Sequence, residues 1–211
     1  MPDAKPTVLI IDDDPDVRTS TARLLRSLGL DTQLFACIPD FLKSNLPDGP
    51  TCLVLDVRLP GQSGLDLQRE LAAAHRELPI IFITGHGDIP MTVQAMKGGA
   101  IEFLTKPFRD QDLLDAIQLG LARDLARREN EKAMAALRER FGSLSPRERE
   151  IMIQVARGRL SKQIAADIGI AEATVKVHRS RLMRKMNARS LPEFCRIVDR
   201  LKLLGEEPSR S

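Results

Sequence analysis

Three short apolar runs in the first half of the chain each end on a polar side chain. The runs, with the residues that follow them, are 8–11 with Asp12 and Asp13, 51–55 with Asp56, and 80–83 with Thr84. Their length and composition predict strands buried on both faces, because they are too short for stable helices. If the strands are parallel, their carboxyl ends share one sheet edge, where open α/β sheets bind ligands. We expect Lys106 to join these polar groups there.

The same alternation of strand and helix continues to about residue 121. Strands are expected over residues 7–11, 32–35, 51–55, 79–83 and 101–104. Helices are expected over residues 15–28, 40–45, 64–74, 89–97 and from 111 onward. The first of these helices should be capped by Asp14 before Pro15. Five strands alternating with five helices predict an α/β domain with a five-stranded parallel sheet covered on both faces.

Composition separates the chain into an acidic half and a basic half. Residues 1–121 hold 11 Lys and Arg against 17 Asp and Glu, whereas residues 122–211 hold 21 against 12. A basic half suggests a nucleic-acid partner. We find no signal peptide or membrane-spanning run, so we expect a cytoplasmic protein without a membrane partner. The 3 cysteines are scattered and do not have the spacing of a metal site.

The acidic turn after residue 11 indicates the chemistry of the first half. Residues 12–16 contain no glycine that would let backbone approach a pyrophosphate, which excludes a dinucleotide site. Crowded carboxylates repel phosphate unless a cation intervenes, and Mg²⁺ prefers such oxygen ligands. A carboxylate beside this ion can accept a phosphoryl group as an acyl phosphate. The predicted roles are nucleophile for Asp56, metal ligands for Asp12 and Asp13, and phosphoryl contacts for Thr84 and Lys106.

Each of these residues also has an ordinary structural alternative. Asp56 could be a turn residue, Thr84 a strand end and Lys106 a solvated surface charge. A Mg²⁺-dependent phosphohydrolase with an aspartate nucleophile is a functional alternative, but it leaves the basic half unexplained.

Four motifs at the predicted strand ends together point to a known family. They are Ile11-Asp12-Asp13, Asp56 followed by residues 59–64, Thr84-Gly85, and Gly99-Ala100 leading to residues 103–108. They resemble the receiver domain of two-component response regulators over residues 7–121. The resemblance implies a flavodoxin-like fold and phosphotransfer from a sensor histidine kinase to Asp56.

The resemblance also implies roles for single residues. Mg²⁺ would be bound by Asp13, Asp56 and the backbone carbonyl of Arg58, with Asp12 acting partly through a metal-bound water. Lys106-Pro107 would be a cis peptide. Phe103 would be an aromatic switch that turns inward as Thr84 moves toward the phosphoryl group, with plain core packing as the alternative. Arg58 and His86 match positions that tune phosphoryl lifetime in the family, but we assign His86 no catalytic part.

Residues 113–141 predict a charged helix between the two halves. Apolar residues keep a helical spacing, but the pattern is interrupted between Arg127 and Lys132. The pattern is therefore shorter than the three or four heptads of a coiled coil. We expect a linker helix over residues 122–142, ended by Gly142, which could also contribute dimer contacts.

Four short helices are expected in residues 143–211. Residues 145–148 form a capping box, Ser161 is expected to cap the second helix, the third runs from about 172 to 186, and Ser190 is expected to cap the fourth. Two helices joined by a short turn containing Gly169 match the helix-turn-helix pattern.

The third of these helices has an apolar face and a cationic face. Val175, Leu182 and Met186 should point into the core. The opposite face has the character of a recognition helix for the major groove, and a merely solvated face is the alternative. We predict base-edge contacts for Lys176, Val177 and Ser180, and mostly phosphate contacts for Thr174, Arg181, Arg184 and Lys185.

Three motifs in this half resemble the DNA-binding domain of the LuxR/NarL/FixJ class. They are residues 144–150, 162–165 and 173–179. The resemblance covers about residues 143–204. One departure is Ala171, where relatives usually have a serine cap, which costs about 1 kcal/mol of helix-end stability.

Together the two resemblances imply a response regulator that controls transcription. Its parts would be a receiver at residues 1–121, a helical linker at 122–142 and a helix-turn-helix domain at 143–211. The partners would be a sensor histidine kinase, double-stranded promoter DNA and a second copy of the chain after phosphorylation, with RNA polymerase a further candidate. The receiver would catalyse only its own phosphorylation and dephosphorylation, so the protein is not expected to be an enzyme. A constitutive DNA-binding protein with a non-signalling receiver is the remaining alternative.

Overall fold

The structure is a computed structural model that describes residues 5–85 and 87–201. These residues form two compact units, within Met1–Arg128 and Glu129–Ser211. His86, which matches a family position that tunes phosphoryl lifetime, lies outside the described residues. Among the helices that are described, each is too short or too polar to cross a bilayer.

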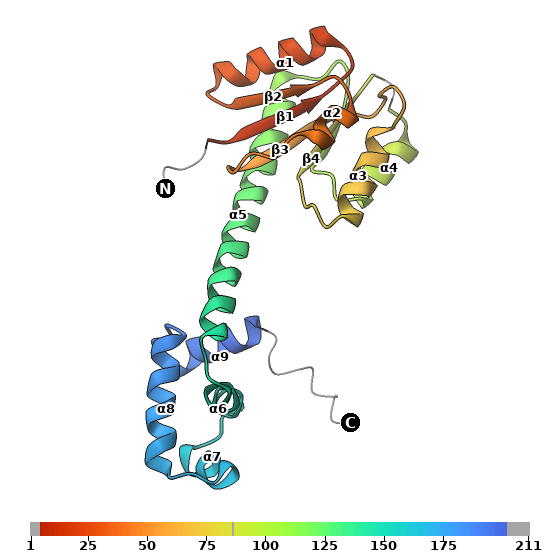
Figure 1. The fold of residues 1–211 in the computed structure, drawn as a ribbon. Helices are drawn as coiled ribbons and strands as arrows, with labels where there is room; N and C mark the ends of the chain where they lie inside the picture. The colour runs from red at the N-terminus through yellow and green to blue at the C-terminus, as the bar shows by residue number, and fades with distance from the viewer. Residues whose placement is uncertain (1–4, 86, 202–211) are drawn as a thin grey trace. The chain divides into compact units, whose positions relative to one another are not determined.

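The first unit contains a five-stranded parallel sheet (Figure 1). The strands are β1 (Thr7–Ile11), β2 (Asp31–Phe35), β3 (Thr51–Asp56), β4 (Ile80–Thr84) and β5 (Glu102–Thr105). Their order across the sheet is β2-β1-β3-β4-β5, so β1 and β3 are neighbours. The predicted parallel α/β fold is confirmed. Where a strand end differs from its predicted position, it differs by one residue.

Successive side chains of each strand point to opposite faces of the sheet, so the apolar strands make both faces apolar, and helices cover both. The helices are α1 (Pro15–Ser27), α2 (Ile38–Lys43), α3 (Gly64–Ala73), α4 (Ile89–Lys97) and α5 (Asp110–Gly142). Leu9, Leu53 and Leu55 face a core formed with α2, α3 and α4. Val8, Ile10 and Val54 face the opposite core, formed with α1 and α5. Burial on both faces explains why these strands read as unbroken apolar runs.

Local signals correctly predicted where the first helix begins. Asp14 precedes Pro15, and its side chain accepts hydrogen bonds from the N–H groups of Asp16 and Val17. The expected cis peptide between Lys106 and Pro107 is present. Residues 122–142 are helical as expected, within the single helix α5. The division into residues 1–121, 122–142 and 143–211 stays a prediction.

The second unit contains four short helices around a separate apolar core. They are α6 (Pro146–Ala156), α7 (Ser161–Ile168), α8 (Glu172–Lys185) and α9 (Leu191–Arg200). Val175, Leu182 and Met186 of the α8 segment are buried in this core, as the helix-face argument predicted. The all-α expectation for this half is therefore confirmed.

Caps at the helix starts agree with the sequence in two cases and differ in one. Ser145 and Glu148 form the expected capping box of α6, and Ser190 caps α9. The prediction that Ser161 caps α7 was wrong, because Ser161 is the first helical residue and Leu160 precedes it. The N–H of Leu160 instead donates to Oε1 of Gln163 at 2.9 Å. That bond satisfies a backbone donor without a hydroxyl cap.

Candidate functional site: an acidic pocket and a cationic helix

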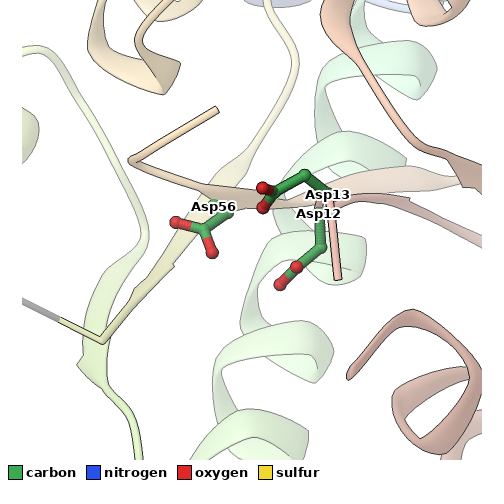
Figure 2. A group of neighbouring side chains, drawn as sticks. All are labelled: Asp12, Asp13 and Asp56. Atoms are coloured by element: carbon green, nitrogen blue, oxygen red, sulfur yellow. The ribbon is translucent and has the colours of Figure 1, made fainter. Parts of the chain in front are cut away.

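Three carboxylates gather at the carboxyl edge of the sheet. Asp12 directly follows β1 and Asp56 ends the neighbouring strand β3. One oxygen from each of Asp12, Asp13 and Asp56 lies within 4.8 Å of the others, and Figure 2 shows the three side chains grouped at the two strand ends. Asp12 and Asp56 are buried, whereas Asp13 is exposed. The predicted convergence of these side chains is therefore present.

Lys106 lies between the two buried carboxylates. Its Nζ donates to Oδ2 of Asp12 at 2.7 Å and to Oδ2 of Asp56 at 2.8 Å. Burial raises the pKa of the Asp12 carboxyl, and the hydrogen bond from Lys106 offsets this only in part. Burial alone would lower the pKa of Lys106, but its hydrogen bonds to both aspartates raise it overall. One ammonium thus compensates two crowded carboxylates.

Backbone donors orient the other carboxylate oxygens. The N–H of Arg58 donates to Oδ1 of Asp56, and the N–H of Asp14 donates to Oδ1 of Asp12, both at 2.9 Å. The guanidinium of Arg18, which sequence reasoning missed, donates to the carbonyl oxygen of Asp12 at 2.5 Å. The only sequence signal for Arg18 was its place one helical turn after the Asp14 cap. These bonds hold each side chain in one orientation.

Glycine at the start of α3 allows the loop after Asp56 to fold tightly. A Cβ atom on Gly64 would lie 2.5 Å from the carbonyl oxygen of Asp56, closer than atoms can approach. The N–H of Gly64 also donates to the carbonyl oxygen of Val57 at 2.9 Å. The glycine in the motif after Asp56 therefore has a steric reason.

Thr84 and Phe103 lie on the next two strands of the sheet. Thr84 is fully buried at the end of β4, and its carbonyl oxygen accepts the N–H of Lys106 at 2.7 Å. Phe103 is partly buried, with its ring centroid 6.2 Å from that of Phe82. A Cβ on Gly87 would lie 2.9 Å from the Phe103 ring and 3.2 Å from the Thr84 methyl group. The loop between β4 and α4 therefore packs against both predicted switch residues.

This donor set fits a hard divalent cation. The three convergent side chains offer only carboxylate oxygens, which are the ligands that Mg²⁺ prefers. Mg²⁺ usually binds through one or two carboxylates and keeps waters for a phosphoryl group. The exposed position of Asp13 leaves the pocket open to such a group.

The outer face of α8 carries most of the residues predicted to contact DNA. Those exposed on α8 are Thr174, Lys176, Val177, Ser180, Arg181 and Arg184. Lys176 makes a surface ion pair with Glu172 at 2.9 Å, which leaves its ammonium near solvent. This face combines positive charge with one exposed apolar side chain, and its role as a recognition helix stays a prediction.

Lys185 is placed differently from the other members of this set. Its Nζ donates to Oε2 of Glu148 at 2.7 Å and to the carbonyl oxygen of Ser143 at 3.3 Å. This hydrogen bond, together with the capping N–H of Ser145, lowers the pKa of Glu148. The ammonium of Lys185 therefore neutralises a buried carboxylate within the unit, and its contact with a DNA phosphate stays a prediction.

Comparison with known protein families gives two matches. Residues 8–118 match the response regulator receiver domain, and residues 142–198 match the bacterial regulatory proteins of the luxR family.

Whole-chain relatives share both halves. Nodulation protein W of Bradyrhizobium diazoefficiens is 53% identical over 93% of this chain and 87% of its own length. The transcriptional regulatory protein FixJ of Azorhizobium caulinodans is 43% identical over 94% of this chain and 93% of its own. Among solved structures, the response regulator StyR has a TM-score of 0.84 and 50% identity, covering 93% of this chain and 99% of StyR. These similarities exclude the phosphohydrolase alternative, because the family consists of transcription regulators rather than enzymes. The chain belongs to the two-component response regulators that join a receiver domain to a LuxR-type helix-turn-helix domain and regulate transcription.

Proposed function

We propose that Asp56 accepts a phosphoryl group from a sensor histidine kinase and that this modification controls dimerisation and promoter binding. The observation that carries the proposal is the convergence of Asp12, Asp13 and Asp56 within 4.8 Å, with Lys106 bonded to two of them. An isolated buried carboxylate is costly, so a cluster of this kind is more simply explained by a site for a cation and a phosphoryl group.

In the transfer step a carboxylate oxygen of Asp56 forms a bond to phosphorus. The bond between phosphorus and the histidine nitrogen of the kinase breaks, and the nitrogen keeps the electron pair. Lys106 and the Thr84 hydroxyl then meet the phosphoryl oxygens. Mg²⁺, held by Asp12, Asp13, Asp56 and the carbonyl of Arg58, would supply neutralisation of the charge on those oxygens.

The surface beside the pocket supports a protein as the phosphodonor. A cavity of about 380 Å³ lies next to Lys106 and is lined by residues of α1 and by the start of α5. Its apolar walls include Val17, Leu24 and Phe108. A partner helix could bury apolar side chains there while presenting its phosphohistidine to Asp56.

The route from the pocket to the dimer contact runs through the loop before α4. This loop packs against Thr84 and Phe103 at Gly87, so movement of either side chain displaces it. On α4, Ile89, Val93 and Met96 are exposed, with Ile89 80% exposed. Phosphorylation would shift the population toward a form in which α4 and β5 pair with a second copy.

Dimerisation would place two α8 helices in successive major grooves of promoter DNA. Lys176, Val177 and Ser180 would contact base edges, while Thr174, Arg181 and Arg184 would contact phosphates. These contacts are made in the cytoplasm, where RNA polymerase is a further partner if target genes are activated.

The test compares wild type with Asp56→Asn and with Asp16→Asn, an exposed carboxylate nearby that serves as control. Each protein is incubated with acetyl phosphate and Mg²⁺, then studied by mass spectrometry, sizing and a DNA-shift assay. Wild type and the control should gain one phosphoryl group, dimerise and bind DNA more tightly, and Asp56→Asn should do none of these. If Asp56→Asn leaves promoter affinity and oligomeric state equal to those of phosphorylated wild type, the chain is a constitutive DNA-binding protein.

A further inference from the structure

The inward face of α5 changes from apolar to charged where the helix reaches the other edge of the sheet. Leu113, Ile117 and Leu121 are buried one turn apart on this face. The next residue in the stripe is Asp124, whose side chain is also fully buried. Spacings of three and four residues keep these side chains on one side of the helix. The sequence therefore has a carboxylate at a position where the apolar stripe of α5 predicts a leucine.

The Asp124 carboxylate joins α5 to the start of β3. Its Oδ2 accepts the N–H of Thr51 at 2.9 Å and Nε of Arg128 at 2.6 Å, and its Oδ1 accepts Nη2 of Arg127 at 2.6 Å. Arg128 also donates to the carbonyl oxygens of Asp48 at 2.8 Å and Pro47 at 3.2 Å. We call this set, Asp124 and Arg128 with the backbone of residues 47–51, the α5 clamp.

Stability alone does not require this arrangement. A buried ion pair often stabilises a fold no more than apolar residues of similar size would. Hydrophobic contact is non-directional, whereas a forked guanidinium and a carboxylate bond only in particular orientations. The α5 clamp therefore fixes the position of the helix along its own axis and its rotation about that axis where the helix leaves the sheet.

The two ends of β3 connect this clamp with the phosphoacceptor. Thr51 begins the strand and Asp56 ends it, about 16 Å apart at the usual rise per residue. On α5, Arg128 is the last residue of the first unit. Nine residues later, Leu137 of the same helix is buried in the apolar core of the second unit. The clamp thus holds the last turn of α5 that belongs to the receiver unit.

We propose that Asp124 and Arg128 are positioning residues for the linker helix, required for phosphorylation of Asp56 to change DNA binding but not for the phosphorylation itself. This inference rests on the function proposed above. With the clamp intact, a change in the receiver moves α5 as one piece. Without it, the turns after Leu121 move independently, and the second unit no longer responds.

The test is Arg128→Gln in the full chain, with Arg123→Gln as the matched control. Arg123 is exposed five residues earlier on the same helix, and in the described part of the chain its guanidinium has no hydrogen bond or ion pair. Both changes therefore remove the same charge from the same helix. Promoter affinity is measured with and without phosphorylation by acetyl phosphate, together with the phosphorylation rate and the hydrogen exchange of the Thr51 amide.

In Arg128→Gln the ratio of phosphorylated to unphosphorylated affinity should fall about 5-fold or more. Its phosphorylation rate should stay within about 2-fold of wild type. The Thr51 amide should exchange faster, and Arg123→Gln should match wild type throughout. Arg128→Lys keeps the charge but loses the forked guanidinium, so its ratio of affinities should lie between those of Arg128→Gln and Arg123→Gln. This variant replaces Arg128→Gln in the test if Arg128→Gln does not fold.

The outcomes separate the clamp from a merely structural ion pair. General destabilisation leaves the ratio of the two affinities unchanged, so an unchanged ratio in both Arg128 variants, with faster Thr51 exchange, overturns the inference. A wild-type ratio near one instead overturns the proposed function, and the inference with it. A large wild-type ratio that only the Arg128 variants lose supports both.

Discussion

Removing the ammonium of Lys106 should make the stability of the receiver unit depend on Mg²⁺. Nζ of Lys106 bonds to Asp12 and Asp56 at 2.7 and 2.8 Å. Lys106→Met keeps the length of the side chain but leaves two buried carboxylates facing each other. We expect the free energy of unfolding to fall, because like charges crowded in a partly desolvated pocket repel.

The size of the effect follows from burial and distance. Two unit charges about 4 Å apart interact by about 4 kcal/mol at an effective dielectric constant near 20. Desolvation of the ammonium offsets much of this, and breaking a buried pair typically costs about 3–5 kcal/mol. The Lys106 side chain is 22% exposed, so we expect the lower end, about 3 kcal/mol. Mg²⁺ at about 100 times its dissociation constant would restore about 2.7 kcal/mol.

The assay is urea unfolding of the full chain with and without Mg²⁺. The sequence has no Trp and no Tyr, so unfolding is followed by far-UV circular dichroism rather than by their fluorescence. Lys97→Met, a change of an exposed lysine on α4, is the control and should behave as wild type. Mg²⁺ should stabilise Lys106→Met more than wild type, because in wild type it competes with the ammonium. If Lys106→Met without Mg²⁺ is as stable as wild type, or if Mg²⁺ stabilises both equally, the electrostatic reasoning is wrong.

Further predictions concern the second unit and α4. Because the hydrogen bond from Lys185 lowers the pKa of Glu148 below its usual 4.5, this carboxylate stabilises the fold above that pH and loses its contribution as the pH falls through its folded-state pKa. Glu148→Gln should therefore reduce the stability measured by urea unfolding at neutral pH by about 2 kcal/mol, and by much less at a pH below the folded-state pKa of Glu148. Arg181→Ala should reduce the slope of log affinity for DNA against log salt by about 1, because we propose that the exposed Arg181 contacts a phosphate. Lys185→Ala should lower the unfolding temperature, because it removes the partner of the buried Glu148 carboxylate. Ala171→Ser should raise stability by about 1 kcal/mol, because α8 has no side-chain cap; an unchanged unfolding midpoint would refute this. Val93→Asp should weaken the phosphorylated dimer at least about 10-fold in sizing experiments without changing the phosphorylation rate, since Val93 is 45% exposed on α4.

Patterns within single segments were sufficient to predict the sheet and most of the acidic pocket. Residues 8–11 and 52–55 are apolar at every position, and such runs are typical of parallel strands that helices cover on both faces. Once the strands are parallel, Asp12 and Asp56 must share an edge, because carboxyl ends of parallel strands lie together. The face of α8 could also be predicted, since a fixed angle per residue decides which side chains point outward.

Contacts between distant segments could not be predicted in this way. Lys185 was assigned to the DNA-facing set from its helix position, and its bond to Glu148, which is 37 residues away, could not be predicted from that position. Ser161 was expected to cap α7, but the backbone enters the helix one residue earlier and a glutamine side chain satisfies the free N–H. The bond of Lys185 depends on a partner brought by folding, whereas the α7 cap was missed because the helix begins one residue earlier than expected and a residue three positions along satisfies its N–H.

The sequence by itself determined the order of strands and helices, the edge at which the aspartates meet and the charge of each half. Those features depend on periodicity and spacing along the chain, which need no knowledge of what packs where. Only the tertiary structure decided that Lys106 bridges two carboxylates and that Asp124 bonds to Thr51, 73 residues away. A buried charge is acceptable only with its partner in place, and that partner is brought by folding rather than by sequence neighbourhood.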